Sequence, residues 1–159
     1  MKNLHRFYLL FLVFILFACG VPSQSNLGKN ERDEDKEREI RQLVADNEHV
    51  KITVLNMKKN KNQSKTTVTI TFDILNKRKD AIIISAQRLS VDERMVDETI
   101  YEMHQEISPQ KAANARLIIQ QADEIEFPEF KNDLEMEIHI SSTEDPSYFE
   151  KHPVKIIFS

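Results

Sequence analysis

The stretch TTVTITFDILN, residues 66–76, decides the fold because its apolar side chains alternate strictly with polar ones. Four apolar residues, from Val68 to Ile74, fall on one side of an extended chain, whereas three threonines and Asp73 fall on the other. A period of two residues indicates a half-buried β-strand, and β-branched residues suit its pleated surface. We therefore predict a strand over residues 66–76 with one face in a hydrophobic core.

The same alternation recurs along the second part of the chain. LEMEIHIS, residues 134–141, places Leu134 and Ile140 on an apolar side and two glutamates on the other. Shorter runs of the same kind lie at 50–54, 82–84, 101–107, 115–119 and 154–158. About seven short strands separated by polar turns predict a mainly β protein, an antiparallel β-sandwich.

The segments between these strands are read from their turn chemistry. NKRKD, residues 76–80, predicts a turn that pairs the strands on either side of it, and residues 89–98 fit either a strand or a helical turn. The chain has only two glycines, Gly20 and Gly28, and both precede the strands. We therefore expect open loops, because tight primed hairpins favour glycine at positive φ.

The N-terminal segment has the pattern of an export signal. Lys2 and Arg6 precede a continuous apolar run of 11 residues, 7–17. A membrane-spanning helix needs about 20 apolar residues, whereas the hydrophobic part of a secretory signal needs about 7–15. The run therefore predicts a signal peptide over residues 1–18.

The end of this signal, Leu16-Phe17-Ala18-Cys19, resembles a bacterial lipobox. The resemblance implies cleavage before Cys19 and attachment of lipid to its thiol, so that the protein is held on the outer side of the cell membrane. Cys19 is the chain's single cysteine, which excludes an intramolecular disulfide. The alternative is an ordinary signal peptide in which the cysteine is incidental.

A charged region separates this cysteine from the strands. Residues 20–30 are small and polar and predict a flexible tether. Residues 31–50 carry the favourable i,i+4 pairs Glu34–Arg38 and Glu37–Arg41, which predict a short charged helix over about 33–46. Residues 19–49 are thus interpreted as anchor, tether and helical stalk, and residues 50–159 as the folded domain.

Charge and glycine content argue against several functions. Without residues 1–18 the chain carries 20 basic and 26 acidic residues, so it has no basic excess for binding nucleic acid. Phosphate-binding loops and the GxSxG nucleophile elbow require glycines that this part of the chain lacks. We therefore predict that the protein is not an enzyme and has neither a cofactor nor a small-molecule substrate.

The order of the strand motifs resembles a known group of domains. KITVLN, then TVTITFDILNKRKDAIIIS, then SPQKAANARLIIQ is similar to the small immunoglobulin-like domains on lipoproteins of Bacillus and related bacteria. The resemblance covers residues 50–159 and implies an immunoglobulin-like β-sandwich. Many such domains have no assigned activity, so it implies fold and location more than function.

Aromatic residues in two loops are candidate partner-binding residues. Phe127 and Phe130 lie in the acidic segment ADEIEFPEF, and Tyr148 and Phe149 lie in SYFEKHP. Exposed aromatic side chains are common in protein interfaces. The alternative is that each loop folds over one end of the sandwich and covers its core, since large apolar side chains are costly to leave in water.

Methionine and histidine raise the alternative of a copper-type metal site. Met103, His104 and His139 are the weak candidates, because thioether and imidazole ligands suit Cu(I). Neighbouring residues of a strand point to opposite faces, which separates Met103 from His104. The sequence therefore favours a membrane-anchored, non-catalytic module that binds or scaffolds an envelope protein, with metal handling as the alternative.

Overall fold

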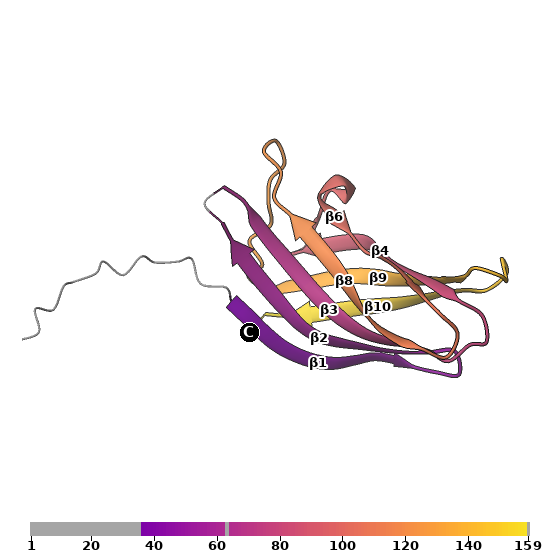
Figure 1. Cartoon of the computed structure of the whole chain (residues 1–159). Helices are drawn as coiled ribbons and strands as arrows, with labels where there is room; N and C mark the ends of the chain where they lie inside the picture. The colour runs from indigo at the N-terminus through magenta and orange to yellow at the C-terminus, as the bar shows by residue number, and fades with distance from the viewer. Residues whose placement is uncertain (1–35, 63, 159) are drawn as a thin grey trace, which may run out of the picture. The chain divides into compact units, whose positions relative to one another are not determined.

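The structure, a computed structural model, describes residues 36–62 and 64–158, which belong to one compact unit. These residues form two antiparallel sheets that pack face to face (Figure 1). The elements are β1 (Lys36–Asp46), β2 (Val50–Lys61), β3 (Thr66–Asn76), β4 (Ile82–Val91), β5 (Arg94–Met95), the 3₁₀ turn η1 (Glu98–Ile100), β6 (Tyr101–Glu102), β7 (His104–Ile107), β8 (Ala112–Gln120), β9 (Asp133–Ser142) and β10 (Phe149–Ile157).

The strand order is that of an immunoglobulin-like sandwich. One sheet has the order β1-β2-β3-β8-β6, and the other has the order β10-β9-β4-β5, with β7 also paired to β4. Strands β2-β3-β8-β6 and β4-β9-β10 reproduce the ABED and CFG sheets of that fold. The segment β6–β7 leaves one sheet and joins the other, because β6 pairs with β8 whereas β7 pairs with β4. The predicted fold class is confirmed.

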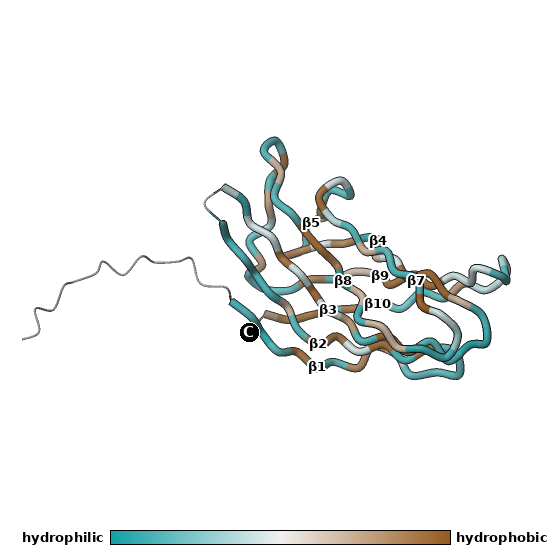
Figure 2. Tube along the Cα trace, viewed as in Figure 1, coloured by the Kyte–Doolittle hydropathy of each residue, from teal (hydrophilic) through white to brown (hydrophobic). Residues whose placement is uncertain are grey.

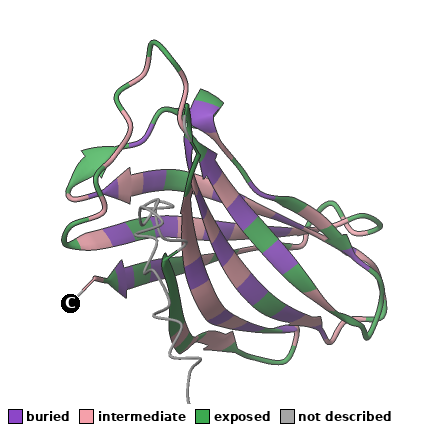
Figure 3. Ribbon diagram, turned by 60° about the vertical axis from the view of Figure 1, so that its left-hand side comes forward, coloured by how far each residue is buried: buried purple, intermediate pink, exposed green. Residues whose placement is uncertain are grey.

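All seven predicted strands are present, and their apolar faces form the core. Phe72, Leu117 and Ile138 are fully buried, as are their apolar neighbours two residues away along each strand. Figure 3 shows buried residues alternating with more exposed ones along the strands, and Figure 2 shows that the loops at both ends are mostly hydrophilic. Burying each such large side chain contributes about 1.5–3 kcal/mol, so this alternation provides the main stabilisation of the fold.

The charged helix predicted for residues 33–46 is wrong where the structure describes it. Residues Lys36–Asp46 form strand β1, which pairs antiparallel with β2 along its length. Ile40 and Val44 pack against the core from this strand, and the Glu37 carboxylate accepts a hydrogen bond from the side-chain amide of Asn56 (3.1 Å). Pairing with an existing sheet edge outweighs i,i+4 ion pairs that are worth only about 0.2–0.5 kcal/mol each.

Two further expectations about organisation need correction. The folded domain begins no later than Lys36 and not at residue 50, so the proposed stalk is partly an edge strand of the sandwich. The strand at 82–84 does not pair with the strand at 66–76: β3 pairs with β2 and β8, whereas β4 lies in the other sheet beside β9. Residues 76–80 therefore form a connection between sheets and not a hairpin turn, which a local turn signal does not distinguish.

The expectation of open loops is also wrong at one hairpin. Val91 pairs with Arg94, so β4 and β5 are joined by the two residues Asp92 and Glu93, both at positive φ (51° and 66°). This is the primed geometry that normally favours glycine. The Asp92 carboxylate accepts hydrogen bonds from the backbone N–H groups of residues 131–133 (2.9, 2.6 and 3.3 Å), which holds the turn in place.

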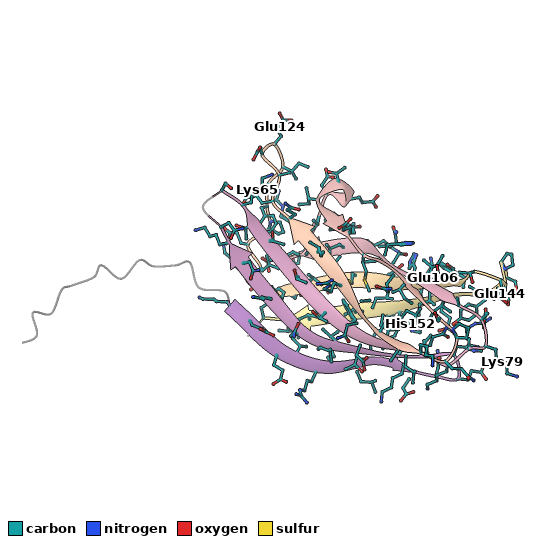
Figure 4. The ribbon with its side chains drawn as sticks, in the orientation of Figure 1. Lys65, Lys79, Glu106, Glu124, Glu144 and His152 are labelled. Carbon is teal, nitrogen blue, oxygen red and sulfur yellow. The ribbon has the colours of Figure 1, made fainter. Side chains whose placement is uncertain are left out.

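The sandwich has two ends with different composition. Strand β1 runs from Lys36, opposite Lys59, to Asp46, opposite Lys51, and its 11 residues span about 35 Å. The "Tyr148 end" contains Asp46 and the loops 77–81 and 143–148. The "Lys65 end" contains Lys36, the β2–β3 hairpin and the loop 121–132. Figure 4 shows Lys79 and Glu144 at the first end and Lys65 and Glu124 at the second.

Candidate functional site

Loops that are far apart in sequence meet at the Tyr148 end, and Asn76 fixes two of them. This residue is fully buried. Its side-chain amide donates hydrogen bonds to the backbone carbonyls of Asp80 (2.8 Å), Ile107 and Ser108 (3.1 Å each), and its oxygen accepts one from the backbone N–H of Arg78 (2.9 Å). The last residue of β3 therefore holds the loop 77–81 against the loop after β7.

An ion pair connects this loop to the β9–β10 connection. The Arg78 guanidinium donates two parallel hydrogen bonds to the Asp80 carboxylate (2.8 Å each) and lies 3.7 Å from Asp145. The hydroxyl of Ser142 also donates to Asp80. These donors, Arg78 first, lower the pKa of Asp80 to about 2. The bidentate geometry is the strong form of an arginine–carboxylate pair.

The aromatic ring of Tyr148 lies within this network. The Arg78 guanidinium lies 3.7 Å from the centre of the ring, and the imidazole of His49 contacts its other neighbours edge-on at 5.3 Å between centres. Burial, followed by the nearby Glu150 carboxylate, raises the pKa of the Tyr148 hydroxyl. Tyr148 is thus held between the β1–β2, β3–β4 and β9–β10 connections.

Polar side chains continue from Tyr148 into the space between the sheets. Glu150 and His152 lie on the inward face of β10, with the imidazole Nε2 of His152 at 2.8 Å from the Glu150 carboxylate. The Asn47 side-chain amide donates to the same carboxylate (3.0 Å). Burial alone would raise the pKa of Glu150, but the hydrogen bonds from Asn47, His152 and Tyr148 lower it overall. The inner face of β10 is therefore polar at this end and apolar from Val154 onward.

The four predicted partner-binding aromatics do not form one surface. Tyr148 is packed in the network just described, whereas Phe149 is 52% exposed on the outer face of β10, edge-on to His139 at 5.1 Å. Phe127 and Phe130 lie at the Lys65 end, in contact with each other (5.9 Å), and Phe130 also contacts Phe158 (6.0 Å). Both pack against the core, which favours the alternative that this loop covers one end of the sandwich.

The weak metal candidates are divided between two faces. Met103 is buried in the core (5% exposed), between β6 and β7. His104 pairs with Ser85 across β7 and β4, and His139 pairs with the same Ser85 across β9 and β4, so the two imidazoles share the outer face of the sheet. In the described part of the chain, no three His, Cys, Asp or Glu side chains are grouped so as to hold a metal ion.

A shallow groove of about 330 Å³ lies at the Lys65 end, between the β4–β5 hairpin and the loop 121–132. Val96 and Phe127 form part of its apolar floor, and an ion pair between Arg94 and Glu126 (3.3 Å) joins its two sides. Both of these charged side chains are more than three-quarters exposed. Such a pair is worth about 0–1 kcal/mol, so it closes the groove only weakly.

The sequence did not indicate the network at the Tyr148 end. It marked residues 76–80 only as a turn and Tyr148 only as an aromatic residue in a loop. Arg78 and Tyr148 are 70 positions apart, and only the strand order of the fold brings them together. The predicted lipid attachment residue, Cys19, lies outside the described residues.

Comparisons with known proteins give the fold little further context. No protein-family model matches the chain, and no curated protein matches it in sequence. Among solved structures, it is similar to the GAE domain of yeast GGA1 (8% identity, TM-score 0.43, 76% of this chain and 99% of that one). It is also similar to an uncharacterized beta-sandwich protein from Clostridium difficile 630 (17% identity, TM-score 0.35, 77% of this chain and 99% of that one).

A third similar structure is a FixG-related protein from Vibrio parahaemolyticus (9% identity, TM-score 0.38, 68% of this chain and 94% of that one). At these identities and TM-scores the likeness carries no argument about activity or partners. The strand order itself defines the class: the chain has an immunoglobulin-like β-sandwich with an additional N-terminal edge strand.

Proposed function

We propose that this protein is a lipoprotein anchored through Cys19 to the outer side of the cell membrane, where its β-sandwich binds or scaffolds a protein of the cell envelope. The apolar run at 7–17 and the lipobox-like Leu16–Cys19 support the anchor. Each buried CH₂ group of an acyl chain contributes about 0.8 kcal/mol, so two or three chains suffice for stable attachment.

The observation that carries the proposal is the direction of β1. The chain enters the sandwich at Lys36, at the Lys65 end, whereas the ordered loop network is about 35 Å away at the Tyr148 end. Sixteen residues separate Cys19 from Lys36, which gives a reach of at most about 60 Å. A domain anchored in this way presents the Tyr148 end away from the membrane.

The chemistry of that end supports binding more than catalysis. Arg78 is engaged by Asp80, and His152 is engaged by Glu150. A catalytic base or nucleophile acts through a polar atom that is directed at the substrate, whereas these groups are directed at one another. What remains on the outside is a rim of charged side chains, including Lys79 and Glu144, beside the half-exposed ring of Phe149.

The anchor is tested by changing Cys19→Ser in the native host and separating membranes from soluble protein. We expect the variant to keep its signal peptide and to lack the mass of the lipid, whereas the wild-type protein is cleaved and fractionates with membranes. An unchanged mass and an unchanged membrane fraction in the variant would show that the thiol is not the attachment point.

The partner surface is tested by crosslinking from opposite ends in intact cells. A photo-crosslinking residue at Lys79 or Glu144 reports the Tyr148 end, and the same residue at Lys65 or Glu124 is the matched control at the other end. We expect one discrete crosslinked protein from the first pair and none of that mass from the second. Equal crosslinking from both ends would contradict the assignment of the surface.

Metal handling is the second candidate, supported only by the shared face of His104 and His139. Titration of the purified protein with Zn(II) and Cu(I), monitored by calorimetry, tests it directly. Binding tighter than micromolar that disappears in the variant His104→Ala/His139→Ala would favour this function over protein binding.

A further inference from the structure

The charges of the Lys65 end are divided between two neighbouring segments. The β2–β3 hairpin, residues 58–65, carries four lysines and no acidic residue: Lys58, Lys59, Lys61 and Lys65. The loop 121–132 carries four acidic residues before its single lysine: Asp123, Glu124, Glu126 and Glu129. The two segments meet where the backbone N–H of Gln121 donates to the carbonyl of Thr66 (2.9 Å). One end of the molecule is therefore basic on one side and acidic on the other.

The hairpin is a well-ordered extension of the sandwich. Lys58 and Lys59 continue the ladder between β2 and β3, opposite Thr69 and Val68, and the turn is closed by a hydrogen bond from the N–H of Asn62 to the carbonyl of Lys65 (2.9 Å). Lys61 and Lys65 are exposed at the tip. The ammonium group of Lys59 lies 5.8 Å from the centre of the Phe130 ring, which fixes the base of the hairpin to the loop beside it.

The position of the hairpin relates it to the membrane anchor. Lys36, the first residue of β1, pairs with Lys59 at the base of the hairpin. The segment that leads back to Cys19 therefore leaves the domain beside the lysine-rich tip and not beside the Tyr148 end. Anionic lipid surfaces attract clusters of lysine that are held within a Debye length of them.

We propose that the lysine-rich β2–β3 hairpin contacts anionic phospholipid headgroups, so that the anchored domain rests on this hairpin with its acidic loop turned away from the bilayer. The inference rests on the proposed anchoring at Cys19. It adds an orientation: the lipid chains set the distance to the membrane, and the hairpin selects which side of the Lys65 end faces it. The net negative charge of the domain opposes other orientations because they bring carboxylates to the same surface.

Lysine labelling tests the contact without depending on lipidation in cells. Residues 19–159 are coupled through the Cys19 thiol to a maleimide lipid in vesicles of either phosphatidylglycerol or phosphatidylcholine. The rate at which an N-hydroxysuccinimide ester modifies each lysine is then measured by mass spectrometry. Lys79, at the Tyr148 end, and Lys131, on the acidic loop, are the matched controls.

We expect Lys61 and Lys65 to react about threefold more slowly on phosphatidylglycerol than on phosphatidylcholine, with Lys79 and Lys131 unchanged. The difference is expected to disappear when salt is raised from 0.1 to 1 M, because the Debye length falls from about 10 to about 3 Å. In the variant Lys61→Glu/Lys65→Glu, protection of Lys58 and Lys59 is expected to be lost. Equal hairpin rates on the two lipids, or equal protection of Lys131, would overturn the proposal.

The two proposals fail separately in these experiments. Loss of the lipid mass or of membrane fractionation in cells concerns Cys19 alone. The vesicle measurement supplies the anchor chemically, so its result concerns the hairpin alone.

Discussion

The two ends of the sandwich are stabilised by different interactions. At the Tyr148 end, Asn76, Arg78 and Glu150 connect three loops through hydrogen bonds and ion pairs. At the Lys65 end, Phe127 and Phe130 cover the core with apolar surface, and the charged side chains around them are mostly exposed. Directional bonds fix loop positions more narrowly than apolar contact does, so the first end is the better platform for recognising a partner.

The largest effect is expected at the Tyr148 end for Asn76→Ala. The change removes four hydrogen bonds and leaves buried carbonyl groups without their donor, which is expected to cost about 3 kcal/mol. Urea denaturation measures it. Asn114→Ala, at an exposed position of β8, is the matched control and is expected to change the stability by less than about 0.5 kcal/mol. Similar values for the two variants would remove the difference between the ends.

At the Lys65 end, Phe130→Ala is expected to destabilise the protein by about 2 kcal/mol, because the half-buried ring loses its contacts with Phe127 and Phe158. The same substitution at the exposed Phe149 is expected to cost about 0.5 kcal/mol or less. The comparison of urea midpoints distinguishes a residue that covers the core from one that is available to a partner. A larger loss at Phe149 would reverse these assignments.

A pH-dependent effect is expected only at the Tyr148 end. The pKa of Asp80 is lowered from 3.8 to about 2, so the stabilising contribution of its carboxylate is complete above pH 4 and is lost as the pH falls toward 2. In Asp80→Asn, the urea midpoint is expected to vary less between pH 4 and pH 2 than in the wild-type protein. Asp123→Asn, in the exposed acidic loop, provides the control, and an equal flattening there would contradict the role of Asp80.

The smallest effect is a gain in stability at the β4–β5 turn. Glu93 has φ of 66°, a conformation that costs a side chain with a Cβ about 1–2 kcal/mol. Glycine avoids this cost but loses more backbone entropy, so Glu93→Gly is expected to stabilise the protein by about 0.5 kcal/mol. Thermal denaturation measures it against Met95→Gly, in the adjoining strand, which is expected to be destabilising. A loss in both variants would show that the turn is not strained.

The strand pattern, and with it the fold class, could be predicted from sequence because alternation is a local signal. Val68 to Ile74 and Leu134 to Ile140 are buried as the alternation requires. Strand β1 could not be predicted in this way: its charged residues satisfy helical spacing, and its extended form depends on pairing with β2, which is not encoded within residues 36–46. The primed turn at Asp92 is held by backbone groups 40 residues away and gives no local signal either.

The candidate site was predictable only in part. Tyr148 and Phe149 were singled out as aromatics in a polar loop, and the structure separates them into a packed ring and an exposed one. Asn76 and Arg78 lay within a segment interpreted as a simple turn. Their partners, at 107–108 and 142–148, follow from the order of strands in two sheets, which the alternation of side chains does not specify.

The direction of β1 has a mechanical consequence for a tethered protein. A pull between the membrane anchor and a partner at the Tyr148 end enters the domain at Lys36 and acts parallel to β1. The hydrogen bonds between β1 and β2 run perpendicular to the strands, so such a load stretches the whole ladder at once and does not open it one bond at a time. The same edge strand that extends the sheet would then act as its strain-bearing attachment.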